Sequence, residues 1–170
     1  MSFHRPLRFL LLAACLTLAS FAHTAQAVET APAAATESKV GVVADRVQRM
    51  LDGALGLVGI RYRRGGDSTE TGFDCSGFVG FVVLENLGLR LPRTAREISQ
   101  AGEPVAKTEL EPGDLVFFNT MRRAFSHVGI YIGDNQFVHA PRSGQKVRVE
   151  DMRESYWAKR YNGARRVGVE

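Results

Sequence analysis

The feature that most constrains the fold is an apolar stretch in the middle of the chain, Asp74 to Leu87, with the sequence DCSGFVGFVVLENL. Wound as a helix, its large apolar side chains cover nearly the whole circumference, which is typical of a helix buried on all sides. Asp74 suits the N-cap position, and Gly88 suits the position just past the C-terminal end. We therefore expect a buried helix with Cys75 in its first turn, around which the rest of the domain packs.

The remaining pattern predicts an α+β domain. Apolar residues recur at helical spacing from Lys39 to Leu55, and Gly56 follows them. Thr94 and Glu97 form the capping-box pattern of a short helix that reaches Gln100. Strands are predicted at 114–118, 127–132, 136–140, 146–150 and 161–169. Because the helices come first and the strands follow without βαβ alternation, we expect an antiparallel sheet.

The first 27 residues have the pattern of an export signal. Arg5 and Arg8 precede an apolar run, Phe9 to Leu18, that is too short to span a bilayer stably. Ala25-Gln26-Ala27 supplies the small residues of a cleavage site. An uncleaved anchor is the alternative, but no longer apolar span follows in the sequence. We expect an exported, periplasmic protein without a transmembrane helix after cleavage.

A second signal pattern competes with the first. Leu12-Ala13-Ala14-Cys15 is similar to the cleavage box of bacterial lipoproteins, in which Cys15 would carry lipid and hold the protein at the outer membrane. Against it, only Phe9 to Leu11 would then serve as the apolar core, and the apolar character continues past Cys15. A mature N-terminus at Val28, found by mass spectrometry, would exclude the lipid.

Cleavage after Ala27 changes the charge and the expected domain boundaries. Basic residues fall from 22 to 20 against 18 acidic residues, because the removed segment carries Arg5 and Arg8. The small positive charge that remains gives no argument for a nucleic-acid partner. Residues 28–38 have no apolar period and are expected to form a flexible leader. The domain itself is then expected at 39–170.

Only three residues of the processed chain are cysteine or histidine: Cys75, His127 and His139. A lone cysteine in an oxidising compartment forms no internal disulfide, so it is either buried and inert or kept for its chemistry. At a helix N-terminus, unpaired backbone amides place positive charge beside the sulfur and favour the thiolate. The expected position of Cys75 therefore favours a reactive thiol.

The two histidines fall on the two strands of a predicted hairpin. With a three-residue loop at 133–135, His139 lies opposite Gly129, and His127, two residues away, shares that face. A two-residue loop would place the two rings on opposite faces of the sheet. In the first register, His127 can act as the base for Cys75, and His139 can orient the ring of His127.

Five blocks of the sequence, FDCSGFV, LPRTAREI, LEPGDLVFF, SHVGIYIG and QFVHA, resemble in order and spacing those of the NlpC/p60 family of bacterial cell-wall cysteine peptidases. The resemblance runs from about Val47 to Val167, and the closing YWAKRYNGARRV is similar to that of periplasmic murein endopeptidases. It implies a papain-like fold and hydrolysis of peptide bonds in peptidoglycan stems, with no cofactor. By position, it implies Cys75 as nucleophile, His127 as base and His139 as the third polar residue.

The resemblance also implies three substrate-binding residues. Tyr62 matches a tyrosine that lines the active site of the family, and Asp74 and Ser76 flank the nucleophile. Ordinary structural roles explain these residues as well: Tyr62 can pack within a strand, and Asp74 can cap the helix.

One segment departs from the family pattern. The family usually shows Pro-Tyr-x-aromatic-Gly-Gly where this chain has Arg61-Tyr62-Arg63-Arg64-Gly65-Gly66. The departure leaves open which stem peptide fits. Acidic stem peptides are candidate partners for Arg61, Arg63 and Arg64, but a solvated basic loop is the more frequent explanation of such residues. We interpret Arg93 and Ser126 as surface residues, and we expect the loop Met121 to Phe125 to border the cleft.

Three questions stay open at this point. The scissile bond is either the D-Ala–diaminopimelate cross-link, which the closing stretch favours, or a bond within the stem after D-glutamate. A zinc enzyme with Cys75, His127 and His139 as ligands is an alternative, although no short ligand pair nucleates such a site. A module that binds peptidoglycan without cutting it is the third reading. Nothing in the sequence indicates the oligomeric state.

Overall fold

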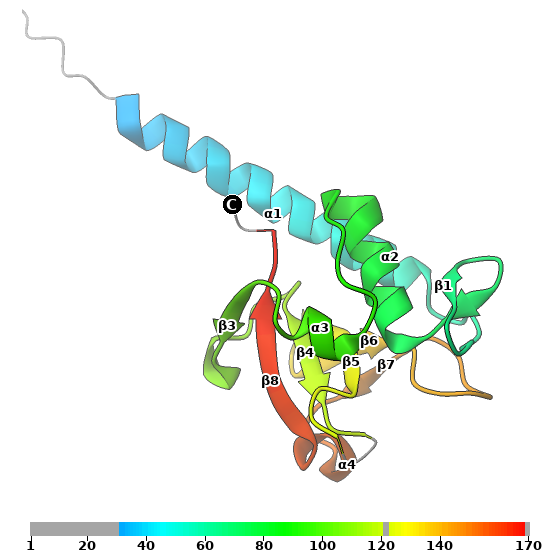
Figure 1. Cartoon of the computed structure of the whole chain (residues 1–170). Helices are drawn as coiled ribbons and strands as arrows, with labels where there is room; N and C mark the ends of the chain where they lie inside the picture. Colours follow the sequence, from blue (N-terminus) through cyan, green and yellow to red (C-terminus); the bar gives the residue numbers. More distant parts are fainter. Residues whose placement is uncertain (1–30, 121–122, 169–170) are drawn as a thin grey trace, which may run out of the picture. The chain divides into compact units, whose positions relative to one another are not determined.

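The structure, a computed structural model, describes residues 31–120 and 123–168, with side chains from residue 41 onward (Figure 1). The helices are α1 (Ala31–Gly56), α2 (Cys75–Leu87), α3 (Ala95–Ile98), the 3-10 helix η1 (Lys107–Glu109) and α4 (Ser155–Ala158). The strands are β1 (Asp67–Ser68), β2 (Gly72–Phe73), β3 (Glu103–Val105), β4 (Leu115–Phe118), β5 (His127–Gly133), β6 (Gln136–His139), β7 (Arg148–Asp151) and β8 (Tyr161–Arg166). The expected signal at 1–27 and the lipidation site Cys15 lie outside the described residues.

Six of these strands form one antiparallel sheet in the order β3-β8-β4-β5-β6-β7, and β1 and β2 form a separate antiparallel pair. This confirms the expected α+β class. The sequence did not predict β1, β2, β3 or α4, because elements of two to four residues are too short to show a hydrophobic period. Within the described ranges, no helix is long and apolar enough to cross a membrane.

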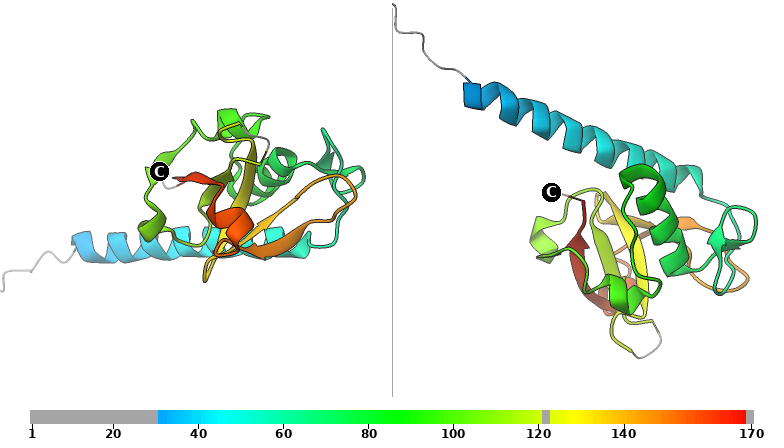
Figure 2. Two further views of the ribbon diagram at one scale, coloured as in Figure 1. Left: turned by 90° about the horizontal axis from the view of Figure 1, so that it is seen from below. Right: turned by 45° about the horizontal axis from the view of Figure 1, so that its top comes forward.

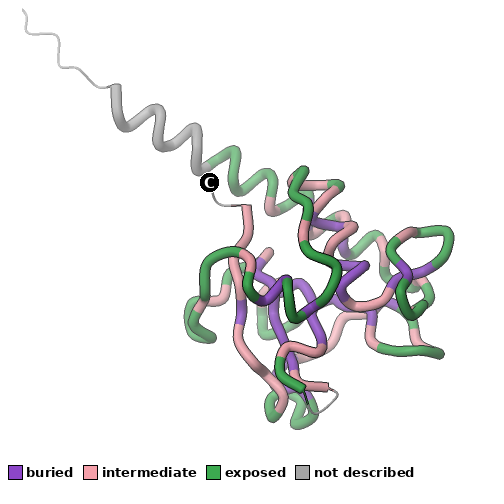
Figure 3. Tube along the Cα trace, viewed as in Figure 1, coloured by how far each residue is buried: buried purple, intermediate pink, exposed green. Residues whose placement is uncertain are grey.

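Alternating side chains of the sheet build a separate apolar cluster on each face. Leu115 and Phe117 of β4 join a cluster with α1 and α2, whereas Val116 and Phe118 join a second cluster that Trp157 of α4 completes. Helix α1 runs beside α2 (Figure 2). The tube drawing shows the buried stretches concentrated in α2 and the central strands (Figure 3). Different helices therefore pack on the two faces of the sheet: α1 and α2 on one face, and α4 on the other.

Helix α1 confirms the helix expected from Lys39 but begins earlier, at Ala31. The helix therefore includes residues 31–38 of the expected leader, while residues 28–30 lie outside the described part. This segment is rich in alanine, which has the highest helix propensity, and proline is tolerated in a first helical turn. A segment without any apolar period can thus still be helical. Met50 and Ala54 are buried in the first cluster.

Helix α2 is the buried helix that the sequence predicts. Its start is capped as expected, because Asp74 Oδ1 accepts a hydrogen bond from the Gly77 amide at 2.7 Å. At its end, Gly88 adopts a left-handed conformation with φ 70°, and its amide donates to the Leu84 carbonyl at 3.0 Å. Both caps fix Cys75 as the first residue of the helix.

The β5–β6 hairpin has the register that the catalytic interpretation requires, but it reaches that register through a different turn. The turn is the two-residue Asp134-Asn135, both at positive φ, with Gly133 opposite Gln136. Such a turn alone would separate the two histidine rings. A β-bulge just before Gly133 adds one residue to β5 and restores the pairing of Ile130 with Val138. The predicted loop length was wrong, and the predicted register at the histidines is confirmed.

The other predicted elements are confirmed with shifted ends. Thr94 and Glu97 form the capping box at the start of α3, which ends at Ile98 rather than Gln100. Strand β4 lies within the predicted 114–118, and β7 and β8 overlap the predicted 146–150 and 161–169. Strand β8 pairs with both β3 and β4, so the end of the chain closes the sheet as expected.

Candidate active site

Cys75 lies where the start of α2 approaches the start of β5. Its side chain packs against the first apolar cluster, and the backbone amide of Val128 in β5 donates toward its sulfur. Val128 directly follows His127, the first residue of β5. Helix α2 covers one face of the sheet and the histidine rings lie on the other, and the Val128 amide, next to His127, is the contact that joins Cys75 to β5.

The thiol of Cys75 is neutral in the resting site. Burial raises its pKa to about 11, and the Asp74 carboxylate acts in the same direction. Hydrogen bonds from the amides of Val128, Ser76 and Cys75 itself lower the pKa by less. The amides at the helix N-terminus favour the thiolate, as expected, but desolvation of the sulfur outweighs them, so the pKa of Cys75 is raised overall.

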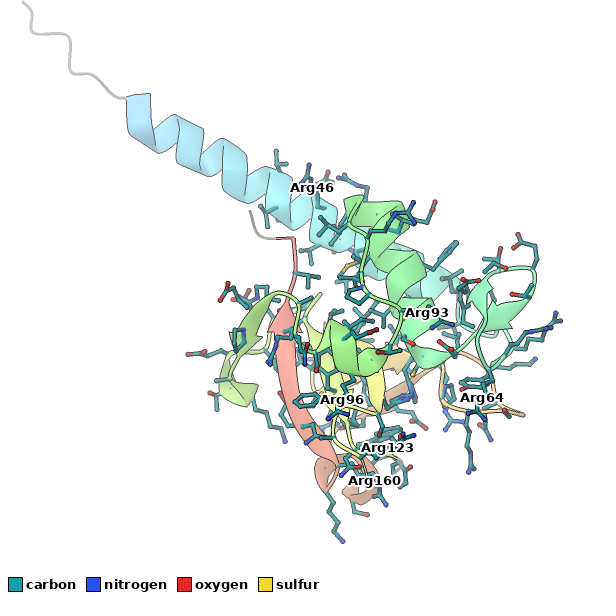
Figure 4. The ribbon with its side chains drawn as sticks, in the orientation of Figure 1. Arg46, Arg64, Arg93, Arg96, Arg123 and Arg160 are labelled. Atoms are coloured by element: carbon teal, nitrogen blue, oxygen red, sulfur yellow. The ribbon has the colours of Figure 1, made fainter. Side chains whose placement is uncertain are left out.

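A hydrogen-bonded hub of Asp74, Ser76 and Arg93 lies beside Cys75. The Arg93 guanidinium donates to Asp74 Oδ1 at 3.0 Å and to Oδ2 at 2.8 Å, and it also donates to Ser76 Oγ at 3.0 Å. Ser76 Oγ donates to Asp74 Oδ1 at 3.1 Å, and the Gly65 amide donates to Oδ2 at 2.9 Å. Figure 4 shows Arg93 beside the lower part of α2. The cap of α2 is therefore tied to two distant segments.

The hub keeps the Asp74 carboxylate ionised. Burial alone would raise the pKa of Asp74, but the hydrogen bonds and charge of Arg93, with the Gly77 amide, outweigh burial and lower it. Arg93 is exposed, as expected, yet it is held by both carboxylate oxygens rather than solvated as a surface residue. No periodicity in the sequence could reveal this pairing, because the partners are 19 residues apart.

Tyr62 is the third predicted substrate-binding residue, and it lies within electrostatic reach of Cys75 and Asp74. Burial raises the pKa of its phenol, and the charges of Cys75 and Asp74 raise it further. Its backbone forms an isolated bridge with Phe73, at the entry to α2. Arg61 beside it donates to the backbone carbonyls of 70 and 71, so its guanidinium holds the β1–β2 turn.

The histidines form a buried relay that ends on a carboxylate. His127 Nε2 lies 2.7 Å from His139 Nδ1, and His139 Nε2 lies 2.9 Å from Glu150 Oε2. An ionised carboxylate only accepts, so His139 Nε2 carries the proton and its Nδ1 accepts from His127 Nε2–H. Nδ1 of His127 is then left unprotonated. This tautomer is the one that a general base needs.

An aromatic box encloses both rings. Trp157 stacks on His127 with centroids 5.6 Å apart and meets the edge of His139 at 5.1 Å. Phe137 lies 4.7 Å from the His139 ring. Burial lowers the pKa of both histidines, most strongly for His127, where the charge of His139 adds to the effect. Both rings are therefore neutral at neutral pH, as the relay requires.

Gly129 makes room for this arrangement, as the sequence predicts. A Cβ added there would lie 2.7 Å from Phe137 Cδ2 and 3.1 Å from His139 Cβ. Sequence reasoning missed Trp157 and Glu150. Strand β7 pairs His139 with Arg148. The register argument used for the first hairpin would, extended to β7, have placed Glu150 on the face of His139.

Residues 59–166 match the NlpC/P60 family. The chain belongs to this family. Over 123 residues it is 48% identical to the murein DD-endopeptidase MepS/murein LD-carboxypeptidase of Escherichia coli K12, a match that covers 72% of this chain and 64% of that protein. Over 113 residues it is 44% identical to the murein DD-endopeptidase MepH of the same strain, covering 65% and 42%. The match thus spans less than two thirds of either relative.

Solved NlpC/P60 structures share the fold. An NlpC/P60 protein from Bacillus cereus ATCC 10987 has a TM-score of 0.66 at 32% identity, covering 71% of this chain and 39% of that one. The NlpC/p60 domain of the peptidoglycan hydrolase SagA has a TM-score of 0.63 at 28% identity, covering 71% of this chain and 98% of that one. The expected NlpC/p60 fold is confirmed.

Within this NlpC/P60 domain, the geometry gives no support to the zinc alternative. His127 and His139 direct ring nitrogens at one another rather than at a shared point with Cys75. Across 31–120 and 123–168, no group of three His, Cys, Asp or Glu side chains is arranged to hold a metal ion. Of the loop expected to border the cleft, residues 121–122 lie outside the described part, and the ring of Phe125 packs on Phe117.

Proposed function

We propose that this chain is a cysteine peptidase that hydrolyses peptide bonds in peptidoglycan stem peptides. The observation that carries the proposal is the buried His127–His139 pair, whose first member begins the strand against which the Cys75 sulfur packs. The relatives named as murein endopeptidases support the substrate class. Cys75 is the nucleophile, His127 the base, and His139 the residue that orients the base.

The first chemical step is attack of the sulfur on the scissile carbonyl carbon. Because the resting thiol and the resting imidazole are both neutral, Nδ1 of His127 takes the thiol proton as the carbon–sulfur bond forms. The backbone amides of Cys75 and Ser76, which face the sulfur, are assigned to the developing oxyanion. The relay to His139 and Glu150 disperses the positive charge that appears on His127.

The second step releases the two products. His127 donates its proton to the leaving amine, and the acyl group stays on Cys75 as a thioester. Water, deprotonated by His127, then attacks the thioester carbon, and the thiol leaves with the proton. No cofactor enters either step.

We assign the scissile bond to the D-Ala–diaminopimelate cross-link. Two relatives at 44% and 48% identity are named murein DD-endopeptidases, which supports this assignment. The alternative is the bond between D-glutamate and diaminopimelate in the same stem. It is favoured by the gamma-DL-glutamyl hydrolase of Bacillus subtilis, 43% identical over 110 residues, although that match covers only 26% of the Bacillus protein.

The substrate is assigned to the side of Cys75 bordered by Tyr62, Asp74 and Ser76. Tyr62 supports this best, since its phenol lies near both the thiol and the Asp74 carboxylate. Both oxygens of the Asp74 carboxylate already accept hydrogen bonds, so we assign Asp74 mainly to holding this wall of the site. Arg63 and Arg64 are exposed at the same segment, where they would meet the acidic stem. We assign this action to the periplasm, after export through the expected 1–27 signal, with an outer-membrane lipoprotein held through Cys15 as the alternative; the relatives named for murein support a cell-wall location.

The test is digestion of cross-linked muropeptides by the chain beginning at Val28 and by its Cys75→Ser variant, with products sized by mass. Cleavage at the cross-link yields two monomeric muropeptides, whereas cleavage after D-glutamate yields a shortened stem. The variant should give neither product. EDTA should leave the rate of the unmodified chain unchanged, and loss of activity in EDTA would restore the zinc alternative.

The same experiment distinguishes an enzyme from a module that binds peptidoglycan without cutting it. A pure binding module would retain muropeptides on a column without changing their masses, for the unmodified chain and the variant alike. An enzyme changes the masses only while Cys75 is intact.

A further inference from the structure

We infer that Glu150 is a positioning residue of the site, which fixes the tautomer of His139 and, through it, leaves Nδ1 of His127 as the proton acceptor. The inference rests on the proposed function and extends it from three residues to four. The observation is the unbroken line of contacts from His127 Nε2 to His139 Nδ1, and from His139 Nε2 to Glu150 Oε2.

Without an acceptor at Nε2, the neutral His139 ring has two tautomers of similar energy. In one, Nδ1 accepts from His127, and in the other Nδ1–H points at His127 Nε2 and forces the proton of His127 onto its own Nδ1. The second tautomer removes the lone pair that must take the thiol proton. A carboxylate at 2.9 Å from His139 Nε2 selects the first.

Glu150 is itself held for this purpose. Its side chain is 16% exposed, and its second oxygen, Oε1, forms an ion pair with Arg148 on the same strand. Arg148 also donates to Gln145 Oε1, which anchors the guanidinium. Each carboxylate oxygen thus has its own partner. Burial alone would raise the pKa of Glu150, but the contacts with His139 and Arg148 outweigh it and lower the pKa, so the carboxylate stays ionised.

The sheet geometry explains why the side chain at position 150 reaches the His139 ring. His139 pairs with Arg148 and Phe137 pairs with Glu150 across β6 and β7, so all four side chains share one face. Trp157 closes that face over His139. In the described structure, the charged or titratable groups that act on Glu150 are His139 and Arg148, and His139 also contacts His127.

The charge and the hydrogen bond of Glu150 can be separated by two variants. Glu150→Gln keeps an oxygen that can accept from His139 Nε2–H but loses the negative charge, whereas Glu150→Ala loses both. Asp151→Asn on the same strand is the matched control, since Asp151 pairs with Arg153 and is not part of the relay. The pH dependence of kcat/KM for muropeptide cleavage is measured for all four proteins.

The two variants should differ in a defined way. Glu150→Ala should lower kcat about twofold or more with little change in KM, because about half of the His127 rings then carry their proton on Nδ1 and have no lone pair for the thiol proton. Glu150→Gln should recover much of that kcat. In both, the acid limb of the profile should move to lower pH, since loss of the carboxylate makes the histidine pair harder to protonate. Asp151→Asn should match the unmodified chain.

Nitrogen-15 NMR of the histidine rings tests the tautomers without any turnover. His139 should carry its proton on Nε2 in the unmodified chain and in Glu150→Gln, and should show mixed tautomers in Glu150→Ala. A Glu150→Ala spectrum and pH profile that both match the unmodified chain would overturn the inference. If the unmodified chain cleaves no muropeptide, the proposed function fails, while the ring tautomers still decide the role of Glu150.

Discussion

The two halves of the candidate site are built by different physics. The thiol half is a helix cap, Asp74 to Ser76, held by an exposed arginine. Its polar contacts are partly local and partly made with segments 9 and 19 residues away. The histidine half is a dry box in which His127 and His139 are at most 3% exposed and most partners come from another strand or helix. The thiol half is therefore positioned by hydrogen bonds that water can replace. The histidine half is positioned by packing and by one ordered relay of hydrogen bonds.

The largest expected effect falls on the histidine half. His127→Ala should lower the rate of muropeptide cleavage about a thousandfold or more, because it removes the group that moves the proton in both steps. A thermal unfolding curve of the variant checks that the chain is folded. Retention of more than a tenth of the activity by a folded variant would mean that the relay is structural.

For the thiol half, we expect the rate of Cys75 alkylation to depend strongly on pH. Since burial raises the pKa of Cys75 to about 11, the thiolate fraction at pH 7 is small and grows tenfold with each pH unit. Alkylation by iodoacetamide, followed by mass, should therefore be about a hundredfold faster at pH 9 than at pH 7. The chain is used from Val28, where Cys75 is the only cysteine, with Cys75→Ser as the blank. A rate that is already at its plateau at pH 7 would show a stable thiolate and contradict the neutral resting pair.

Packing in the histidine half predicts the largest change in stability. Trp157 is 5% exposed and contacts both histidine rings, so Trp157→Ala should lower the free energy of unfolding by about 3–5 kcal/mol. The neighbouring Tyr156 is 46% exposed, and Tyr156→Ala should cost less than about 1 kcal/mol. Urea unfolding measures both. Equal costs would mean that the box does not depend on its tryptophan.

Disrupting the hub of Asp74, Ser76 and Arg93 should cause a smaller loss of stability, and the size of this loss should depend on pH. Arg93→Ala should cost about 1–2 kcal/mol at pH 7, a figure reduced because the Arg93 side chain is 45% exposed. The pKa of Asp74 is lowered in the fold, so its stabilisation is present above the ordinary aspartate pKa of about 4 and is lost as the pH falls below it. The difference in unfolding free energy between the variant and the unmodified chain, measured with urea, should therefore shrink as the pH falls from 7 toward 3. A constant difference between pH 3 and pH 7 would assign the cost of the variant to packing alone.

The same contrast explains what the sequence could and could not predict. The capped helix with Cys75 at its start was predictable, because Asp74, Gly88 and the apolar run are local signals. The face shared by the histidines was predictable from strand pairing, although a bulge rather than a longer turn produces it. Arg93 and Trp157 were not predicted, because each acts through a partner that only the complete fold brings near. Glu150 was missed because the strand-register argument was not extended to β7. The neutral thiol was missed because burial of one sulfur cannot be read from its neighbours in the chain.

The most direct test of the account is the rate of muropeptide cleavage by the double variant Cys75→Ala/His127→Ala, compared with each single variant. Groups that act as one unit are strongly non-additive, so the double variant should be no slower than Cys75→Ala alone. If the two losses instead multiply, the sulfur and the imidazole act independently, and the joined site described at the start of β5 is not the catalytic unit.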